Sequence, residues 1–242
     1  NARDWSSDVC SSDLDIIRII TPGTVMTSSM LEEGRNNFIC AVYRDSAGTG
    51  LCFCDISTGK THLTAFSGPD RVEHVVNELG RFSPAEAVVN DGAASEKALT
   101  DALTEKFRCR VENGGEGRFR LAEAERNIRR QFGEEAFDRL PRTNPAAAMA
   151  LGGLLHYLYE TQKTDLSHIN DLDYYEQGRF MELDLTARRN LELTETLRDR
   201  EKRGSLLWVL DKTRTPMGGR LLRSWLERPL LSVTAIAKRN AA

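Results

Sequence analysis

The residue types that most often carry catalysis are sparse in this chain and lack catalytic spacing. Its four histidines form no H-x-x-x-H pair and stand beside no pair of acids, which disfavours a metal site; they are His62, His74, His156 and His168. No G-x-S-x-G motif marks a serine nucleophile. The glycine-rich stretch 112–118 matches neither phosphate-binding pattern, G-x-G-x-x-G or G-x-x-x-x-G-K-[ST], and is expected to form a flexible surface loop. The sequence therefore predicts no catalytic, cofactor-binding or metal-binding residue.

The composition indicates a globular protein with a real core. The chain has 242 residues, enough for one large or two ordinary domains, and a net charge of −3. That charge argues against a protein that coats DNA, because neutralising phosphates needs clustered Lys and Arg. No apolar run approaches the roughly 20 residues that span a bilayer. The five cysteines form no C-x-x-C pair, so Cys40, Cys52 and Cys54 are expected to be buried thiols in a reducing cytoplasm.

The period of the apolar residues changes along the first half of the chain. Residues 37–43, 50–56 and 60–66 read as three strands joined by turns, an antiparallel meander with Phe38, Phe53 and Phe66 in its core. Three helices then alternate with two strands: helices at 69–79, 95–105 (opened by Ser95) and 121–132, and strands at 85–89 and 107–111. This order predicts an α/β sandwich of the ribonuclease-H-like type.

That fold class includes nucleases, which hold two divalent ions with several carboxylates, the first of them on the first strand. The expected first strand here contains no acid. Asp55 ends the second strand and Asp91 follows the fourth, but two scattered acids make no cluster. Asp55 precedes Ile-Ser-Thr-Gly and is expected to bond its own turn. A ribonuclease-H-like nuclease and a stand-alone interaction module remain as alternative functions.

The second half of the chain reads as helices. Gly133, Pro141 and Asn144-Pro145 indicate a domain boundary, after which Asn144 caps a long helix reaching about residue 163. Gly152 and Gly153 weaken that helix by about 1 kcal/mol each unless close packing offsets the loss. Residues 164–177 read as irregular.

Capping residues mark the helix ends in the stretch 180–231. Asp184 is expected to cap a helix over 186–197, Ser205 a short one over 206–210, and Thr215-Pro216 a third that Arg228-Pro229 ends. The third helix carries one apolar stripe, formed by Met217, Leu221, Leu222, Trp225 and Leu226. Its Gly218-Gly219 pair would let another helix approach closely.

Three further interpretations concern charged and aromatic side chains of this stretch. Trp208 and Trp225 are expected in a core, whereas Trp5 lies among residues 1–14, which do not fit the rest of the chain. One of Arg188 and Arg189 should pair with a carboxylate at a domain joint while the other meets solvent, because neighbours on a helix face different ways. The basic residues of the run 198–203 alternate with acids, which favours a solvated, self-paired loop over phosphate contact.

The runs LDLTARRNLELTETLR (183–198) and LDKTRTPMGGRLLRSWLERPLL (210–231) closely resemble the core of the MutS family of bacterial DNA mismatch repair proteins. IIRIITPGTV (16–25) resembles the link between that family's mismatch-reading and connector domains. The resemblance implies a fragment: residues 15–24 close the mismatch-reading domain, 25–140 form a ribonuclease-H-like connector, and 141–242 begin an all-α core (lever) domain. Residues 1–14 resemble sequencing-adapter read-through and are expected to be non-native.

The same resemblance implies a function. The intact family protein would bind mispaired or looped double-stranded DNA as a homodimer, use ATP and Mg²⁺, recruit a MutL-type repair factor and work in the cytoplasm, with no membrane partner. This fragment lacks the P-loop, the mismatch-inserting Phe-x-Glu motif and any cofactor of its own. Its role would be to couple the DNA-reading end to the ATPase end.

Overall fold

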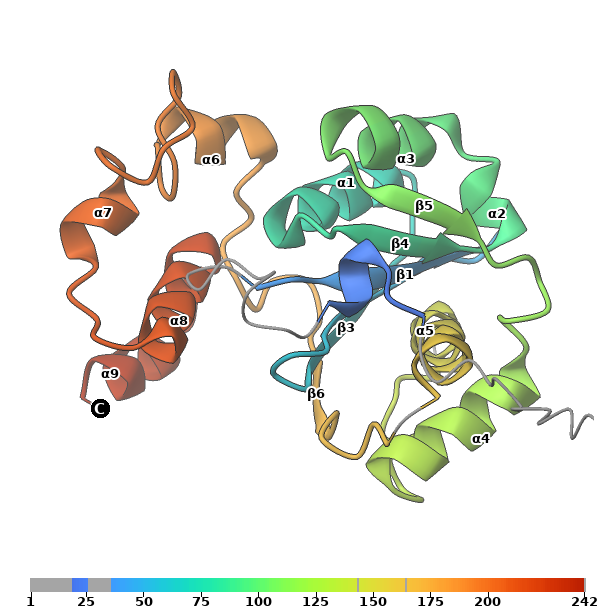
Figure 1. Ribbon diagram of the computed structural model, residues 1–242. Coiled ribbons are helices and arrows are strands. Elements are labelled where there is room, and N and C mark those ends of the chain that lie inside the picture. Colours follow the sequence, from blue (N-terminus) through green and yellow to red (C-terminus); the bar gives the residue numbers. More distant parts are fainter. Residues whose placement is uncertain (1–18, 26–35, 143, 164, 242) are drawn as a thin grey trace, which may run out of the picture.

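The computed structural model describes residues 19–25, 36–142, 144–163 and 165–241, and its main element there is a mixed sheet with the strand order β5-β4-β1-β2-β3-β6 (Figure 1). The predicted antiparallel meander is confirmed as β1 (Ile39–Arg44), β2 (Thr49–Asp55) and β3 (Lys60–Phe66). β4 (Glu86–Val89) and β5 (Arg110–Asn113) continue the sheet parallel to β1. Residues 15–20, which also read as a short strand in the sequence, lie mostly outside the described residues.

Side chains alternate between two buried faces of the sheet, as a strand of period two requires. On one face Cys40 and Val42 pack under α1 (Arg71–Phe82) and α3 (Lys97–Asp101). On the other, Ile39 and Ala41 pack against α5. Because both faces are covered, every residue of β2 is buried.

The helix predicted over 95–105 forms differently. Asn90 caps a short helix, α2 (Asp91–Ala94), by accepting a hydrogen bond from the backbone of Ala93, and Ser95 ends that helix instead of opening the next. α3 then continues into a π-helical turn, η3 (Ala102–Lys106). The earlier start follows from Asn90, whose side chain bonds the free N–H groups of α2 before Ser95 is reached.

The long helix α5 (Ala146–Gln162) lies against the sheet together with α4 (Leu121–Phe132). Its contact with β2 is so close that a Cβ on Gly50 would stand 1.9 Å from the carbonyl oxygen of Ala146. A Cβ on Gly152 would likewise meet Ala124 at 2.2 Å. The two-sided burial of α5 explains why its apolar residues show no single stripe.

The segment 164–177, predicted to be irregular, contains a further strand, β6 (Asp171–Tyr174), parallel to β3 at the sheet edge. Its four residues alternate polar and apolar, a pattern too short to stand out among neighbouring acids. Residues 36–175 are called here the α/β unit.

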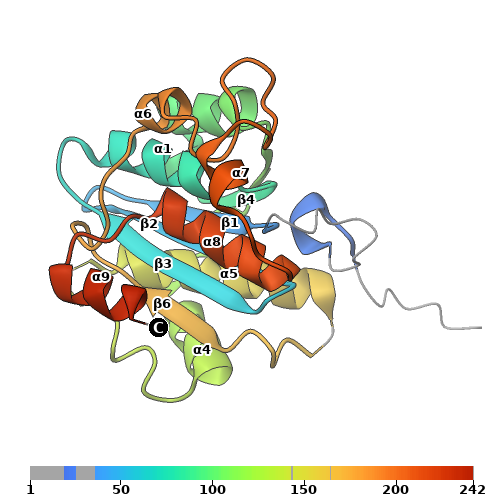
Figure 2. The same cartoon turned by 90° about the vertical axis from the view of Figure 1, so that its left-hand side faces the viewer.

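The remaining chain forms the helical segment, residues 185–240, which lies beside one end of the α/β unit (Figures 1 and 2). Its helices are α6 (Leu185–Asn190), α7 (Leu206–Leu210), α8 (Pro216–Glu227) and α9 (Val233–Asn240). The predicted caps Asp184, Ser205 and Thr215 each accept a hydrogen bond from the first turn. α6 is shorter than predicted, because the chain turns at Glu192, whose φ is 46°. Within the described ranges, no helix is long and apolar enough to cross a bilayer.

Candidate functional site

The two acids that could begin a nuclease site lie at opposite ends of the sheet. Asp55 ends β2 and Asp91 follows β4, and these two strands run in opposite directions along β1. The Asp55 carboxylate accepts hydrogen bonds from the backbone N–H and hydroxyl of Ser57, at 2.9 and 2.6 Å, which confirms its predicted turn role. Asp91 accepts the side-chain amide of Asn113 at 3.0 Å. The sheet therefore keeps these carboxylates too far apart to share metal ions.

The cysteines fill space in the sheet. Cys40, Cys52, Cys54 and Cys109 are free and buried, as predicted for the first three. Burial raises the pKa of Cys54 and of Cys109 to about 12, so both stay protonated thiols at neutral pH. Across the described part of the chain, no three His, Cys, Asp or Glu side chains converge as metal ligands would.

The helical segment meets the α/β unit through a cluster of arginine and aromatic side chains, here called the arginine–aromatic joint. Arg228, the residue that ends α8, places its guanidinium 4.3 Å from the ring centre of Phe82 and 5.2 and 5.5 Å from those of Tyr175 and Phe180. Arg81 of α1 stacks on the same three rings, at 4.8, 5.1 and 5.9 Å. Each guanidinium gains cation–π attraction from a shared apolar surface.

Carboxylate and phenol groups compensate the charge of these two arginines. Glu78 pairs with Arg81 and accepts the Tyr175 hydroxyl at 2.6 Å, and Arg81 also donates to that hydroxyl oxygen at 2.7 Å. Burial, together with the like charge of Arg81, lowers the pKa of Arg228 to about 10. Arg228 therefore remains a cation at neutral pH. Its buried charge depends on the neighbouring groups of the joint for compensation.

His62 of β3 faces two opposite charges at the edge of this joint. Its Nδ1 lies 3.4 Å from the Arg228 Nη1 and 3.4 Å from a carboxylate oxygen of Asp173 in β6. A neutral imidazole accepts from Arg228, whereas a protonated one would donate to Asp173. Burial lowers the pKa of His62, which favours the first arrangement. Burial raises the pKa of Asp173, but its contacts with His62 and Arg179 outweigh this and bring it to about 2.

A second charged contact holds α6 against α8. Arg188 lies 3.7 Å from Glu227, which also receives Arg223 at 3.1 Å, and Arg223 reaches Glu195 at 3.4 Å. Burial lowers the pKa of Arg188. Arg189 is exposed, so the prediction that one arginine of the pair meets a carboxylate and the other meets solvent is confirmed.

The segment that leads into the α/β unit is fixed at a separate place. The turn η1 (Pro22–Thr24) docks on the fully buried carboxylate of Glu86 in β4, through the Thr21 hydroxyl and the Gly23 N–H, the latter at 3.0 Å. The Tyr157 hydroxyl donates to the other oxygen of Glu86 at 2.7 Å. A Cβ on Gly23 would approach the Cβ atoms of Glu86 and Ile39 to 2.9 Å, so the docking of this turn on Glu86 requires glycine at position 23.

The predicted burial of the tryptophans is wrong in this chain. Trp208 in α7 is 49% exposed. Trp225 in α8 is 37% exposed, although Arg239 of α9 lies 4.6 Å from its ring centre. In the basic run, Lys202 pairs with Asp211 at 2.5 Å, while Arg198 and Arg200 are exposed. Gly218 and Gly219 meet the side chain of Thr213 and no described helix.

Sequence reasoning missed the residues that build the two joints. Glu86 is the first residue of β4, an otherwise apolar strand. A lone acid in such a strand signals that the carboxylate has buried hydrogen-bond partners. Arg228 was interpreted only as the end of a helix before proline. Tyr157 and Tyr175 carry no pattern of their own, since their partners come from distant parts of the chain.

The α/β unit is thus fixed at two places: to the incoming turn through the buried carboxylate of Glu86, and to the helical segment through the stacked arginines. The family models MutS domain II and MutS domain III match residues 37–170 and 186–242. The chain therefore belongs to the MutS family.

Individual relatives give the same result. The DNA mismatch repair protein MutS of Clostridium novyi (strain NT) is 41% identical over 231 residues, covering 94% of this chain and 24% of the relative. The protein of that name from Symbiobacterium thermophilum is 40% identical over 230 residues, covering 94% and 26%. The chain thus spans about a quarter of the length of these curated relatives.

Proposed function

We propose that this chain is the connecting part of a DNA mismatch recognition ATPase, a protein that binds mispaired or looped DNA and initiates mismatch repair. The relatives that carry the name DNA mismatch repair protein MutS support this proposal. The segment performs no chemistry of its own and couples the DNA-reading end to the ATPase end. In the whole protein, ATP and Mg²⁺ would bind outside this segment.

The observation that carries the coupling role is the arginine–aromatic joint. Arg228 closes α8 and at the same time stacks on Phe82, the last residue of α1. A rotation of the helical segment must therefore either move α1 with it or break this stack. Rigid elements joined through a few discrete contacts are the usual means by which one domain biases another.

The finer fold and domain assignment belongs to the same proposal. The core order β3-β2-β1-β4-β5, with only β2 antiparallel to its neighbours, supports a ribonuclease-H-like connector. The packing of α5 and β6 on that sheet supports a connector that extends to about Tyr175, beyond the predicted limit of residue 140. The helical segment would then open the all-α core domain.

The partners follow from the proposed role. The whole protein would act on mismatched double-stranded DNA as a homodimer, recruit a MutL-type repair factor and work in the cytoplasm. The absence of a membrane partner belongs to the same proposal.

A segment exchange tests the function. Residues 19–241 would replace the matching segment of the Clostridium novyi relative, and the chimera would be expressed in a bacterium that lacks its own mismatch repair protein. We expect the chimera to lower the spontaneous mutation frequency, and Arg228→Ala to raise it again without lowering the amount of protein. Arg214→Ala is the matched control, because Arg214 is exposed on the loop before α8.

A chimera that folds, binds DNA and leaves the mutation frequency unchanged would contradict the proposal. The coupling role fails separately if Arg228→Ala in the chimera leaves both repair and ATP-driven release from DNA unaltered.

A further inference from the structure

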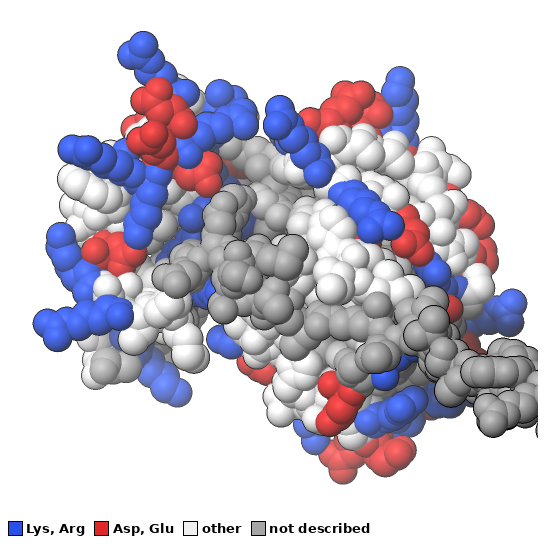
Figure 3. Space-filling view, in the orientation of Figure 1, with Lys and Arg blue, Asp and Glu red and all other residues white. Residues whose placement is uncertain are grey.

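A groove of about 780 Å³ lies between the α/β unit and the helical segment. Nine Lys or Arg residues and two glutamates line it, although the chain as a whole carries a net charge of −3. Figure 3 shows Lys and Arg side chains on both sides of the space between the two parts, near its upper end. The groove lining therefore carries net positive charge, although the chain as a whole is negative.

Four of these cations are exposed and have no carboxylate within ion-pair distance among the residues that the structure describes. Lys60 begins β3 and Lys106 ends η3, on the α/β side, whereas Arg189 of α6 and Arg200 of the following loop belong to the helical side. Like charges that gather without compensation repel one another, and an anionic ligand would relieve that repulsion.

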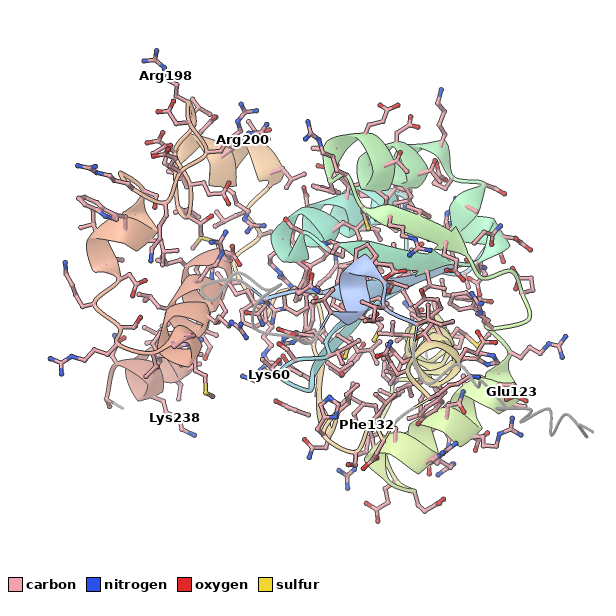
Figure 4. All side chains as sticks on the ribbon, viewed as in Figure 1. Lys60, Glu123, Phe132, Arg198, Arg200 and Lys238 are labelled. Carbon is pink, nitrogen blue, oxygen red and sulfur yellow. The ribbon has the colours of Figure 1, made fainter. Side chains whose placement is uncertain are left out.

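The placement of the charges favours a long anion over a single phosphate. Arg200 lies high on the helical side and Lys60 lower, on the α/β side (Figure 4), an arrangement that suits an elongated anionic ligand. Phe38 and Phe107 are half-buried in the walls of the same groove. A groove lined by both cations and aromatic rings is what a nucleic-acid strand meets in proteins that follow its backbone.

We infer that this groove binds the phosphodiester backbone of a nucleic acid, at a site formed jointly by the two units. The inference rests on the proposed function for the choice of nucleic acid over an acidic protein segment. Arg189 and Arg200 supply contacts from the helical side, and Lys60 and Lys106 from the sheet side. Occupancy would hold the two units at one spacing, because the ligand contacts both walls.

The test is a binding titration of the full chain with a fluorescein-labelled 20-nucleotide single strand and with the matching duplex, followed by anisotropy at several salt concentrations. The groove variant carries Lys60→Glu, Lys106→Glu, Arg189→Glu and Arg200→Glu. We expect it to lose at least about tenfold in affinity and to lower the salt slope for the single strand by about 3, since each phosphate contact contributes about 0.7.

The control matches part of the charge change elsewhere. Lys97→Glu with Arg139→Glu reverses two exposed cations of α3 and of the loop after α4, outside the groove lining. Its affinity should fall less than about twofold, because screened charges at a distance contribute little. The corresponding two-residue groove variant, Lys60→Glu with Arg200→Glu, gives the direct comparison. Alanine variants at the four groove positions replace the charge reversals if circular dichroism shows unfolding.

Groove-dependent binding of either oligonucleotide supports the inference, and the tighter one identifies the preferred form. Failure of both to bind, or an equal loss in groove and control variants, overturns it. Poly-glutamate that binds with the same dependence on the groove also overturns it, in favour of an acidic protein segment. Each of these results is independent of the segment exchange, so a chimera that repairs mismatches would leave the proposed function standing.

Discussion

Tyr157, near the middle of α5, donates a hydrogen bond of 2.7 Å to the carboxylate of Glu86, a fully buried residue at the start of β4. The same carboxylate receives Thr21 and Gly23 of the incoming turn. Burial raises the pKa of Tyr157, so this hydroxyl keeps its proton and remains a donor. One buried acid thus fastens a helix, a strand and the entering chain together.

Removing the Tyr157 hydroxyl should destabilise the α/β unit. Tyr157→Phe leaves a buried carboxylate oxygen without its shortest hydrogen bond, and we expect the free energy of unfolding to fall by about 1–3 kcal/mol. Urea denaturation followed by circular dichroism measures it. Tyr174→Phe is the control, because no hydrogen bond joins the half-buried Tyr174 hydroxyl to another described residue. Equal stability of the two variants would contradict the role of Glu86 as a fastening point.

Acid should weaken the protein through His62. Burial lowers the pKa of His62 below its ordinary 6.5, so the folded state disfavours the protonated ring. The stability contributed by the neutral ring is complete above pH 6.5 and is lost as the pH falls through the folded pKa. We expect the free energy of unfolding to decline below pH 6.5, and His62→Gln to flatten that decline. His156→Gln should follow the original curve; a curve that His62→Gln leaves unchanged would refute the assignment.

Alanine at position 152 should destabilise α5 although alanine favours helices. The Cβ would stand 2.2 Å from the Cβ of Ala124 and 2.4 Å from its Cα, so α4 and α5 must move apart. Overpacking of this kind costs about 1–3 kcal/mol, more than the roughly 1 kcal/mol that alanine gains in propensity. Thermal unfolding of Gly152→Ala tests the sign. Gly117→Ala, with open space around its Cβ, should change stability by less than about 0.5 kcal/mol.

The exposed apolar side chains of the helical segment should make the chain prone to nonspecific hydrophobic association. Met217, Trp208 and Trp225 expose much of their surface on α7 and α8. We expect residues 205–231 to exchange amide protons faster than the sheet and the chain to bind a hydrophobic dye, because these helices expose apolar side chains and bury few. Met217→Glu should reduce dye binding, whereas Leu121→Glu on α4 should not. Strong exchange protection of 205–231 in a monomer would count against this account.

Local signals in the sequence were enough for much of this fold. Alternating apolar residues predicted β1–β3, and capping residues predicted the starts of α7 and α8, because both effects depend on neighbours a few positions away. β6 was missed because only four residues pair at an edge. The packing of α5 on the sheet was not predictable, because an apolar helix does not specify what it packs on. The Thr21–Glu86 and His62–Arg228 contacts join residues 65 and 166 positions apart, which no local pattern records.

The position of β6 has a mechanical consequence. The incoming turn is fixed to β4, whereas the outgoing chain leaves through β6, and β1, β2 and β3 lie between them in the sheet. A force applied between the two attachment points therefore acts across five hydrogen-bonded strands. α5 packs on one face of these strands. Because such a packed sheet resists bending, we expect a displacement at one attachment point to be transmitted to the other.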